Sequence, residues 1–191
     1  MTEREDLVVA GCGEADQHQP ELFDSRARAV IRYADPVAWT VAAAIARATR
    51  TSGGLLDAWR HDVAVVVVSD DGPVLTMAQV QTNAEAGFSS PLRYAAANPG
   101  SLAGVACIAS GFRGPTLNFA MRPCDGIPVG LLVGRAWLRR GIARALVLAS
   151  FGASENRGAS ARAVLLVPNT ALPARAALDA SVIDWIRQRV R

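Results

Sequence analysis

The sequence predicts an α/β fold in which layered helices pack on a mixed, mostly parallel sheet. Positions 63–68 are almost continuous valine, which is typical of a strand buried on both faces, as parallel strands are. Apolar segments of strand length alternate with longer helical patterns along the 191 residues. Segment 101–110 is rich in Gly, Ala and Ser, which indicates a helix packed closely between layers.

The first elements follow from local signals near the start of the chain. Leu7–Ala10 is a short apolar run that ends at Gly11, and it predicts a first strand and a turn. Segment 14–34 is polar and mixed and predicts no element. Asp35 and Pro36 supply an N-cap and a first-turn residue, so they predict a helix that begins there.

The middle of the chain combines a turn, a helix and a loop. Residues 70–73 read Asp-Asp-Gly-Pro, which predicts a turn directly after the valine strand. Residues 74–84 predict a helix whose Met77 and Val80 face inward. A loop is expected from Asn83 to Pro91.

The remaining elements complete the alternation of strands and helices. Apolar runs bounded by Gly and Pro predict them. The expected strands are Thr116–Ala120, Ala145–Ala149 and Ala163–Val167, and the expected helices are Gly126–Arg140 and one that starts at Pro173.

Composition excludes several classes of function. Of the residues, 51% are hydrophobic and 19% charged, and the net charge is +3, which predicts one globular domain over 1–191. No basic run with interleaved aromatic residues predicts a nucleic-acid partner. No apolar run reaches the roughly 18 residues that a membrane span needs. The charged, acidic start of the chain and the lack of disulfide spacing between the cysteines predict a cytoplasmic protein.

No cofactor or metal site is expected from the motifs. Gly11-Cys12-Gly13 lacks the spacing and the following helix of a dinucleotide-binding fingerprint. The pair Asp70-Asp71 is explained by its turn and does not need a metal ion. The cysteines Cys12, Cys107 and Cys124 have no metal-ligand spacing.

A series of short motifs suggests a family. Ser90-Pro91 is followed by Ala103-Gly104 and then by Gly-Phe-Arg-Gly-Pro at 111–115. In this order and spacing the motifs resemble the N-terminal half of a β-ketoacyl synthase, which has the thiolase-like fold. The resemblance implies one half of a two-half, layered sandwich, with a buried helix that both halves would share.

The same resemblance identifies a candidate site, which we call the elbow: Pro123, Cys124, Asp125 and Gly126. In the family, the nucleophilic cysteine is the eighth residue after the Gly-Pro pair, at the start of a buried helix. Counting from Pro115 places Pro123 at this position, and Gly126 matches the glycine that the family has three residues later. Cys124 is one residue late, and the negative charge of Asp125 beside it disfavours a thiolate.

The histidines do not complete a catalytic set. The family condenses acyl chains with one cysteine and two histidines, and both of those histidines lie in the C-terminal half of the protein. In this chain, His18 and His61 both precede the elbow. The resemblance therefore implies a non-catalytic accessory protein, similar to a chain length factor, in polyketide or fatty-acid synthesis. The alternatives are an acyltransferase or thioesterase-like enzyme with Cys124 as nucleophile, and a stand-alone binding domain that has lost condensing activity.

The half-fold also predicts partners. A lone half would leave the surface of the shared helix in water, so we expect a homodimer or a heterodimer with a ketosynthase. In the family the strand that corresponds to Thr116–Ala120 pairs with its copy, and this strand is the expected dimer edge. An acyl carrier protein is a further expected partner.

Overall fold

The protein is described from a computed structural model that covers residues 7–16, 23–50, 54–88, 90–154, 158–171 and 180–187. The strands are β1 (Leu7–Ala15), β2 (Val63–Ser69), β3 (Thr116–Ala120), β4 (Ala145–Ser154) and β5 (Gly158–Pro168). The helices are α1 (Ser25–Ile31), α2 (Pro36–Arg50), α3 (Leu55–Trp59), α4 (Val74–Glu85), α5 (Pro91–Ala96), α6 (Ser101–Ser110), α7 (Pro123–Arg139) and α8 (Ala180–Arg187).

The five strands form one sheet in the order β1-β5-β4-β2-β3. Strand β2 is parallel to both of its neighbours, β3 and β4. Strand β5 is antiparallel to both β4 and β1. The sheet is therefore mixed, as the sequence predicted, and β3 lies at one of its edges.

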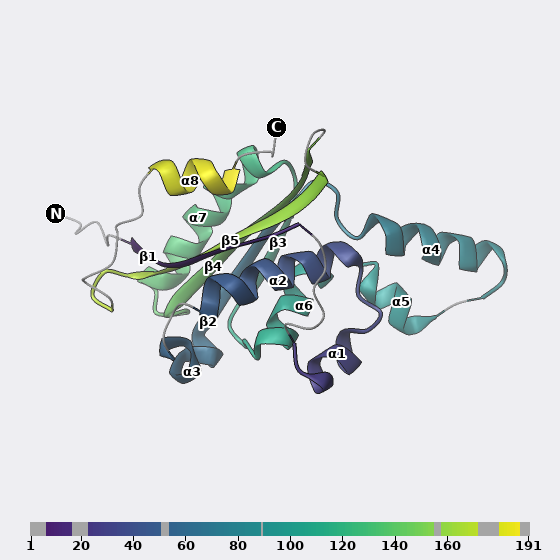
Figure 1. The fold of residues 1–191 in the computed structure, drawn as a ribbon, viewed down its shortest axis with the longest axis horizontal. Helices are drawn as coiled ribbons and strands as arrows, with labels where there is room; N and C mark the ends of the chain where they lie inside the picture. The colour runs from purple at the N-terminus through teal and green to yellow at the C-terminus, as the bar shows by residue number, and fades with distance from the viewer. Residues whose placement is uncertain are drawn as a thin grey trace.

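Helices cover both faces of the sheet (Figure 1). Val63, Val65 and Val67 of β2 pack against α2 and α6, whereas the alternate residues of the strand pack against α7 and α8. Every residue of β2 is buried. This two-sided burial explains why the strand carries valine at almost every position instead of alternating with polar residues.

The predicted start of α2 is confirmed, and it has a second role. The Asp35 carboxylate accepts a hydrogen bond from the Val37 N–H at 2.9 Å through Oδ1 and one from the Thr76 N–H at 2.9 Å through Oδ2. The first bond caps α2. The second holds the first turn of α4, so one buried carboxylate ties together two helices through residues 41 positions apart.

Helix α7 lies unusually close to the sheet because glycines face it. Gly126, Gly130 and Gly134 recur every four residues and therefore share one side of the helix. A Cβ at Gly130 would lie 2.9 Å from Val66 Cγ1, and one at Gly134 would lie 2.8 Å from Leu146 Cδ1. Neither side chain leaves room for a methyl group, so the helix backbone itself forms the contact surface.

Helix α4 differs from the expectation. Met77, expected in the core, is 48% exposed, and Val80 is half-buried. The reason is the position of the element: α4 and α5 pack on each other and project beyond the sheet as an arm, residues 74–97 (Figure 1). The inward faces of these helices meet one another, not a layer of the fold.

Several boundaries also differ from the sequence-based expectations. The loop expected over Asn83–Pro91 is shorter, because α4 continues to Glu85 and Pro91 is already the first residue of α5, which Ser90 caps. Segment 14–34 contains α1, and α7 begins at Pro123, three residues earlier than expected. The expected helix start at Pro173 lies outside the described residues. No helix in the described part of the chain is long and apolar enough to cross a bilayer.

The close approach of α7 can be tested with two glycines of different surroundings. We expect Gly134→Ala to lower the free energy of unfolding by about 1–3 kcal/mol, because the new methyl group forces Leu146 or the helix to move. At Gly104 of α6, no atom lies within 4 Å of the place that a methyl group would take, so Gly104→Ala should raise stability by about 0.5–1 kcal/mol. Urea unfolding measures both, and equal effects would contradict the packing argument.

Candidate functional site

The elbow forms where the edge strand β3 passes into α7. Arg122 has extended backbone and precedes the helix, and Pro123 takes the first helical position, where its missing N–H is not needed. The Pro123 ring is buried against β4, with its Cγ 3.8 Å from the position of a Cβ on Gly152. The N–H groups of Asp125 and Gly126 both donate to the Arg122 carbonyl, at 3.0 and 2.9 Å.

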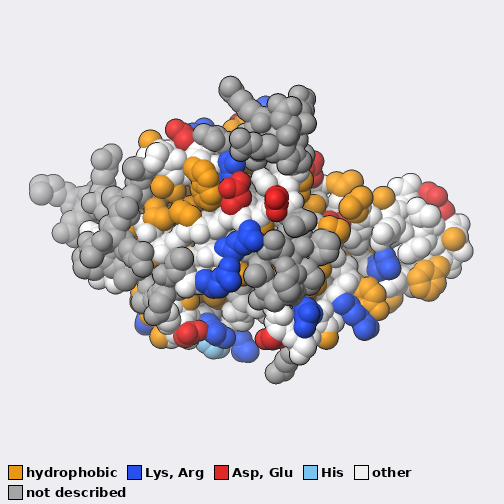
Figure 2. All heavy atoms as spheres, viewed as in Figure 1, with side chains coloured by type: hydrophobic (Ala, Val, Ile, Leu, Met, Phe, Trp, Pro, Cys, Tyr) orange, Lys and Arg blue, Asp and Glu red, His pale blue; other side chains and the backbone are white. Residues whose placement is uncertain are grey.

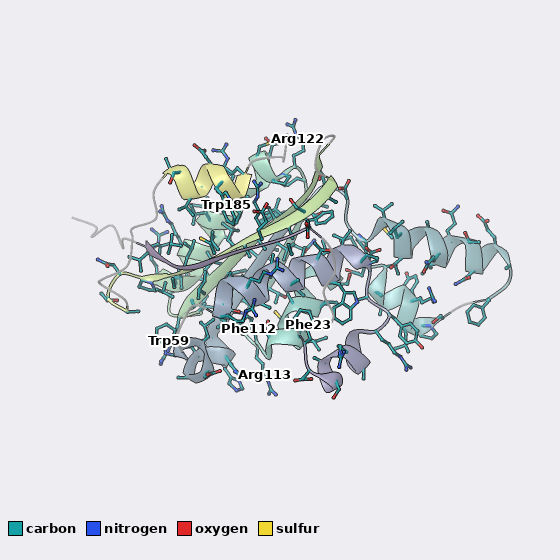
Figure 3. The ribbon with its side chains drawn as sticks, viewed as in Figure 1. Phe23, Trp59, Phe112, Arg113, Arg122 and Trp185 are labelled. Atoms are coloured by element: carbon teal, nitrogen blue, oxygen red, sulfur yellow. The ribbon has the colours of Figure 1, made fainter. Side chains whose placement is uncertain are left out.

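Asp125 forms an ion pair with Arg122. Its Oδ2 accepts from Arg122 Nε at 2.8 Å and lies 2.7 Å from Arg122 Nη2 (Figure 3 labels this arginine). The hydrogen bond and the charge of Asp125 raise the pKa of the Arg122 guanidinium. Both side chains are exposed, so the pair contributes little to stability. It does offset the negative charge that the sequence places beside Cys124.

Cys124 is half-buried at the second position of α7. Its carbonyl oxygen accepts a hydrogen bond from Arg187 Nη2 at 3.3 Å, which brings the last described residue of α8 to the elbow. The sequence alone does not reveal this contact, because 63 positions separate the two residues. Arg187 is thus a residue of the site that sequence reasoning missed.

Polar side chains of β4 and β5 hold the same end of α8. Ser150 Oγ donates to the Ile186 carbonyl at 2.7 Å, and Arg162 Nη1 donates to the Trp185 carbonyl at 2.8 Å. Arg162 also pairs with Glu14 of β1 at 3.0 Å and stacks over the Trp185 ring. These contacts lie on the same sheet face as α7, so the elbow borders a polar cluster.

The described histidine, His61, is not brought to the elbow. His61 is exposed and directly precedes β2. Because β2 and β3 are parallel, the elbow after β3 lies at the opposite end of the sheet, roughly 20 Å away for strands of this length. His18 lies outside the described residues. Within the described ranges, no three His, Cys, Asp or Glu residues gather as metal ligands would.

The motifs that suggested a family have structural roles here. Ser90 accepts from the Arg93 N–H and caps α5. Gly111 ends α6 with a φ of 71°, a conformation that favours glycine. Gly114 lies so close to β2 that a Cβ there would be 2.6 Å from the Val63 carbonyl carbon. Phe112 between them is buried.

Two hollows lie away from the elbow. A cleft of about 550 Å³ opens between α1, α2, α3 and α6, with Phe23 and Phe112 in its lining (Figure 3). Three charged side chains of this cleft already have partners: the Asp24 carboxylate accepts from the Ala27 N–H, and Asp57 pairs with Arg60. A groove of about 630 Å³ runs between α4 and α5 and has a mainly apolar lining.

Comparison with known proteins identifies the fold. No protein-family model matches the sequence, and no curated protein does. A ketosynthase in complex with its chain length factor from Xenorhabdus doucetiae matches with a TM-score of 0.59 and 16% identity over 85% of this chain and 79% of that one. A β-ketoacyl synthase from Burkholderia phymatum matches with a TM-score of 0.68 and 12% identity over 89% of this chain and 60% of that one.

A third structure is a type II polyketide synthase acyl-carrier protein in complex with its ketosynthase bound to the hexaketide. It matches with a TM-score of 0.68 and 14% identity over 91% of this chain and 66% of that one. The thiolase-like fold that the motifs predicted is therefore confirmed. The chain spans less than two thirds of the length of the second and third structures.

The three cysteines should differ sharply in reactivity. Burial in α6 raises the pKa of the Cys107 thiol to about 11, so at pH 8 roughly one molecule in a thousand carries the thiolate. Burial also raises the pKa of the Cys12 thiol, but its side chain is exposed. We expect iodoacetamide to modify the exposed Cys12 and the half-buried Cys124 in the folded protein at least about tenfold faster than the buried Cys107. Peptide mass spectrometry measures each site, with the urea-unfolded protein as control. Comparable rates in the folded protein would contradict the burial of Cys107.

Proposed function

Because the chain has the fold of the ketosynthases, we propose that it is a non-catalytic, ketosynthase-like subunit that resembles a chain length factor. It acts with an active ketosynthase or an acyl carrier protein in polyketide or fatty-acid synthesis. The observation that carries the proposal is Pro123 at the first position of α7, where the resemblance places the nucleophilic cysteine. Proline has no nucleophile, and it has no N–H to donate to an oxyanion.

No histidine of the described residues lies near the elbow, and this supports the same interpretation. Among the described residues, the one histidine is His61, at the far end of the sheet. Decarboxylative condensation needs groups that activate the substrate and move a proton, and histidine is the usual one. A chain of this kind contributes shape and partner contacts to a synthase, with the chemistry carried by the partner.

The outer edge of β3 is the first surface that we propose for pairing. Val65 N–H donates to the Pro115 carbonyl at 3.0 Å, and backbone groups alternate in direction along a strand. Leu117 and Phe119 therefore point their backbone groups toward β2, whereas Asn118 points its N–H and C=O outward. Such an edge is a template for another strand. The partner is a second copy or a ketosynthase that adds its own edge strand.

The arm is the second surface. Large apolar side chains of α4 and α5 are more than two fifths exposed, and Figure 2 shows hydrophobic side chains along the arm. They are Val74, Leu75, Met77, Leu92 and Tyr94. Contiguous exposed apolar surface of this kind marks a protein interface more often than free surface. We propose that the subunit which pairs with β3 also covers the arm.

We further propose that residues 1–191 act as a single domain in the cytoplasm. The described cores on both faces of the sheet share the strands β1, β2, β4 and β5, so the helical layers belong to one unit. The cysteines Cys12, Cys107 and Cys124 are all free thiols, which suits a reducing compartment.

One observation favours the alternative that the chain is an acyltransferase or thioesterase-like enzyme. Cys124 is half-buried at the start of a 17-residue helix, and the adjacent acid Asp125 is already paired with Arg122. In this role the Cys124 sulfur would attack an acyl thioester and release the carrier thiol.

The edge-pairing proposal predicts different effects for two substitutions at one position. Asn118→Pro removes an outward N–H and leaves the bonds to β2 intact, so the chain should fold. We expect pairing to weaken by about tenfold for each lost interface hydrogen bond. Asn118→Ala keeps the N–H and should pair as well as the unaltered chain.

Light scattering after size exclusion measures self-association, and co-purification with a ketosynthase encoded beside this chain measures the heterodimer. A chain that remains a monodisperse monomer and also binds no ketosynthase would contradict the pairing proposal.

An acylation experiment distinguishes the non-catalytic subunit from the enzyme. We expect no mass increase when the protein is incubated with an acyl thioester, because the elbow carries proline in the nucleophile position. Intact-mass spectrometry on the unaltered chain and on Cys124→Ala provides the measurement. An acyl adduct that forms on the unaltered chain and not on Cys124→Ala would favour the enzyme instead.

A further inference from the structure

Helix α8 covers part of the sheet face on which α7 lies. Ile186 is 1% exposed, and it packs with Ile127 of α7 and Leu148 of β4. Figure 1 shows α8 beside α7 on the same side of the sheet. The space between these side chains is only about 10 Å³, so the contact is close-packed. This face is therefore closed by a helix of the same chain.

The end of α8 is held by side chains as well as by packing. The last carbonyls of a helix have no partner within the helix. In α8, Ser150 donates to the Ile186 carbonyl and Arg162 donates to the Trp185 carbonyl, at 2.7 and 2.8 Å. Both donors come from the sheet, so α8 is fixed in position and in rotation.

Arg187 replaces a backbone hydrogen bond that Pro128 removes from α7. A helical N–H normally donates to the carbonyl four residues earlier, so the partner of Cys124 O would be the N–H of residue 128. Proline has no N–H, and Pro128 lies inside α7. The Cys124 carbonyl is bound instead by Arg187 Nη2 at 3.3 Å. One residue of α8 thus supplies the hydrogen bond that α7 cannot make for itself.

We infer that α8 is a built-in cover for the elbow and that Arg187 is the positioning residue that locks it there. Arg187 completes the backbone hydrogen bonding of the first turns of α7, and α7 in turn fixes the end of α8. A ligand that approaches the Cys124 carbonyl must displace the Arg187 guanidinium. The inference does not depend on the proposed function, because every contact in it lies within this chain.

Hydrogen–deuterium exchange on the full chain tests the lock. Arg187→Met keeps the length of the side chain and removes its donors, so the Cys124 carbonyl loses its partner. We expect exchange in α8 and in residues 125–131 to become about tenfold faster, the effect of losing one charge-assisted hydrogen bond. Arg187→Lys, which keeps a donor, should recover part of the protection.

A second pair of variants, both carrying Pro128→Ala, distinguishes the hydrogen bond of Arg187 from its packing. Pro128→Ala restores the N–H that the Cys124 carbonyl lacks. In this background, Arg187→Met should change exchange in residues 125–131 by less than about twofold, since the carbonyl keeps a donor. Equal effects of Arg187→Met with and without Pro128→Ala would overturn the inference, because a packing role of Arg187 does not depend on residue 128.

Asp184→Asn is the matched control. It removes the exposed partner that lies 3.7 Å from Arg187 Nη1 and leaves the Cys124 contact in place. Exchange in α8 should stay within about twofold of the unaltered chain, and a larger change would assign the protection to the ion pair. Should Arg187→Met not fold, the double variant with Pro128→Ala is expected to fold, and its failure would also overturn the lock.

Discussion

The close approach of α7 to the sheet is the constraint on which the rest of this structure depends. Gly126, Gly130 and Gly134 let the helix backbone rest directly on the side chains of β2 and β4. A helix held at this depth presses its first residue against the sheet, and Pro123 suits that place because its φ is already helical and it needs no hydrogen-bond acceptor. The geometry of the elbow is thus a consequence of packing, and it persists without a nucleophile.

Because α7 lies so close to the sheet, the polar groups of this face need hydrogen-bond partners within the protein. Pro128 interrupts the hydrogen bonds of α7, and the polar side chains Ser150 and Arg162 sit on the sheet face that α7 covers. Buried polar groups are costly unless they are paired. Helix α8 resolves both problems, since its last carbonyls accept from the sheet and its Arg187 donates to α7. The final helix is therefore placed by hydrogen bonds as much as by the burial of Ile186.

The range of an interaction decides whether the sequence can predict it. The valine strand at 63–68 and the start of α2 at Asp35 depend on neighbouring residues, and both predictions are confirmed. The inward placement of Met77 is wrong because a helix pattern does not say what lies behind the helix, and α4 packs on α5 in the arm. The Arg187–Cys124 contact spans 63 positions, and no local pattern marks it. The motifs at 111–115 are informative because the backbone requires glycine there.

The distribution of closed and open surfaces separates the two candidate roles. An enzyme would need a group that takes the proton of the Cys124 thiol, and the one histidine of the described residues, His61, lies at the far end of the sheet. A pairing subunit needs only the edge of β3 and the exposed apolar side chains of the arm. A strand added at β3 would extend the sheet and leave α7 and α8 undisturbed. The accessory role thus uses surfaces that the described structure leaves open, whereas the enzyme needs a proton acceptor that no described histidine supplies, and this difference is the physical reason to prefer the accessory role.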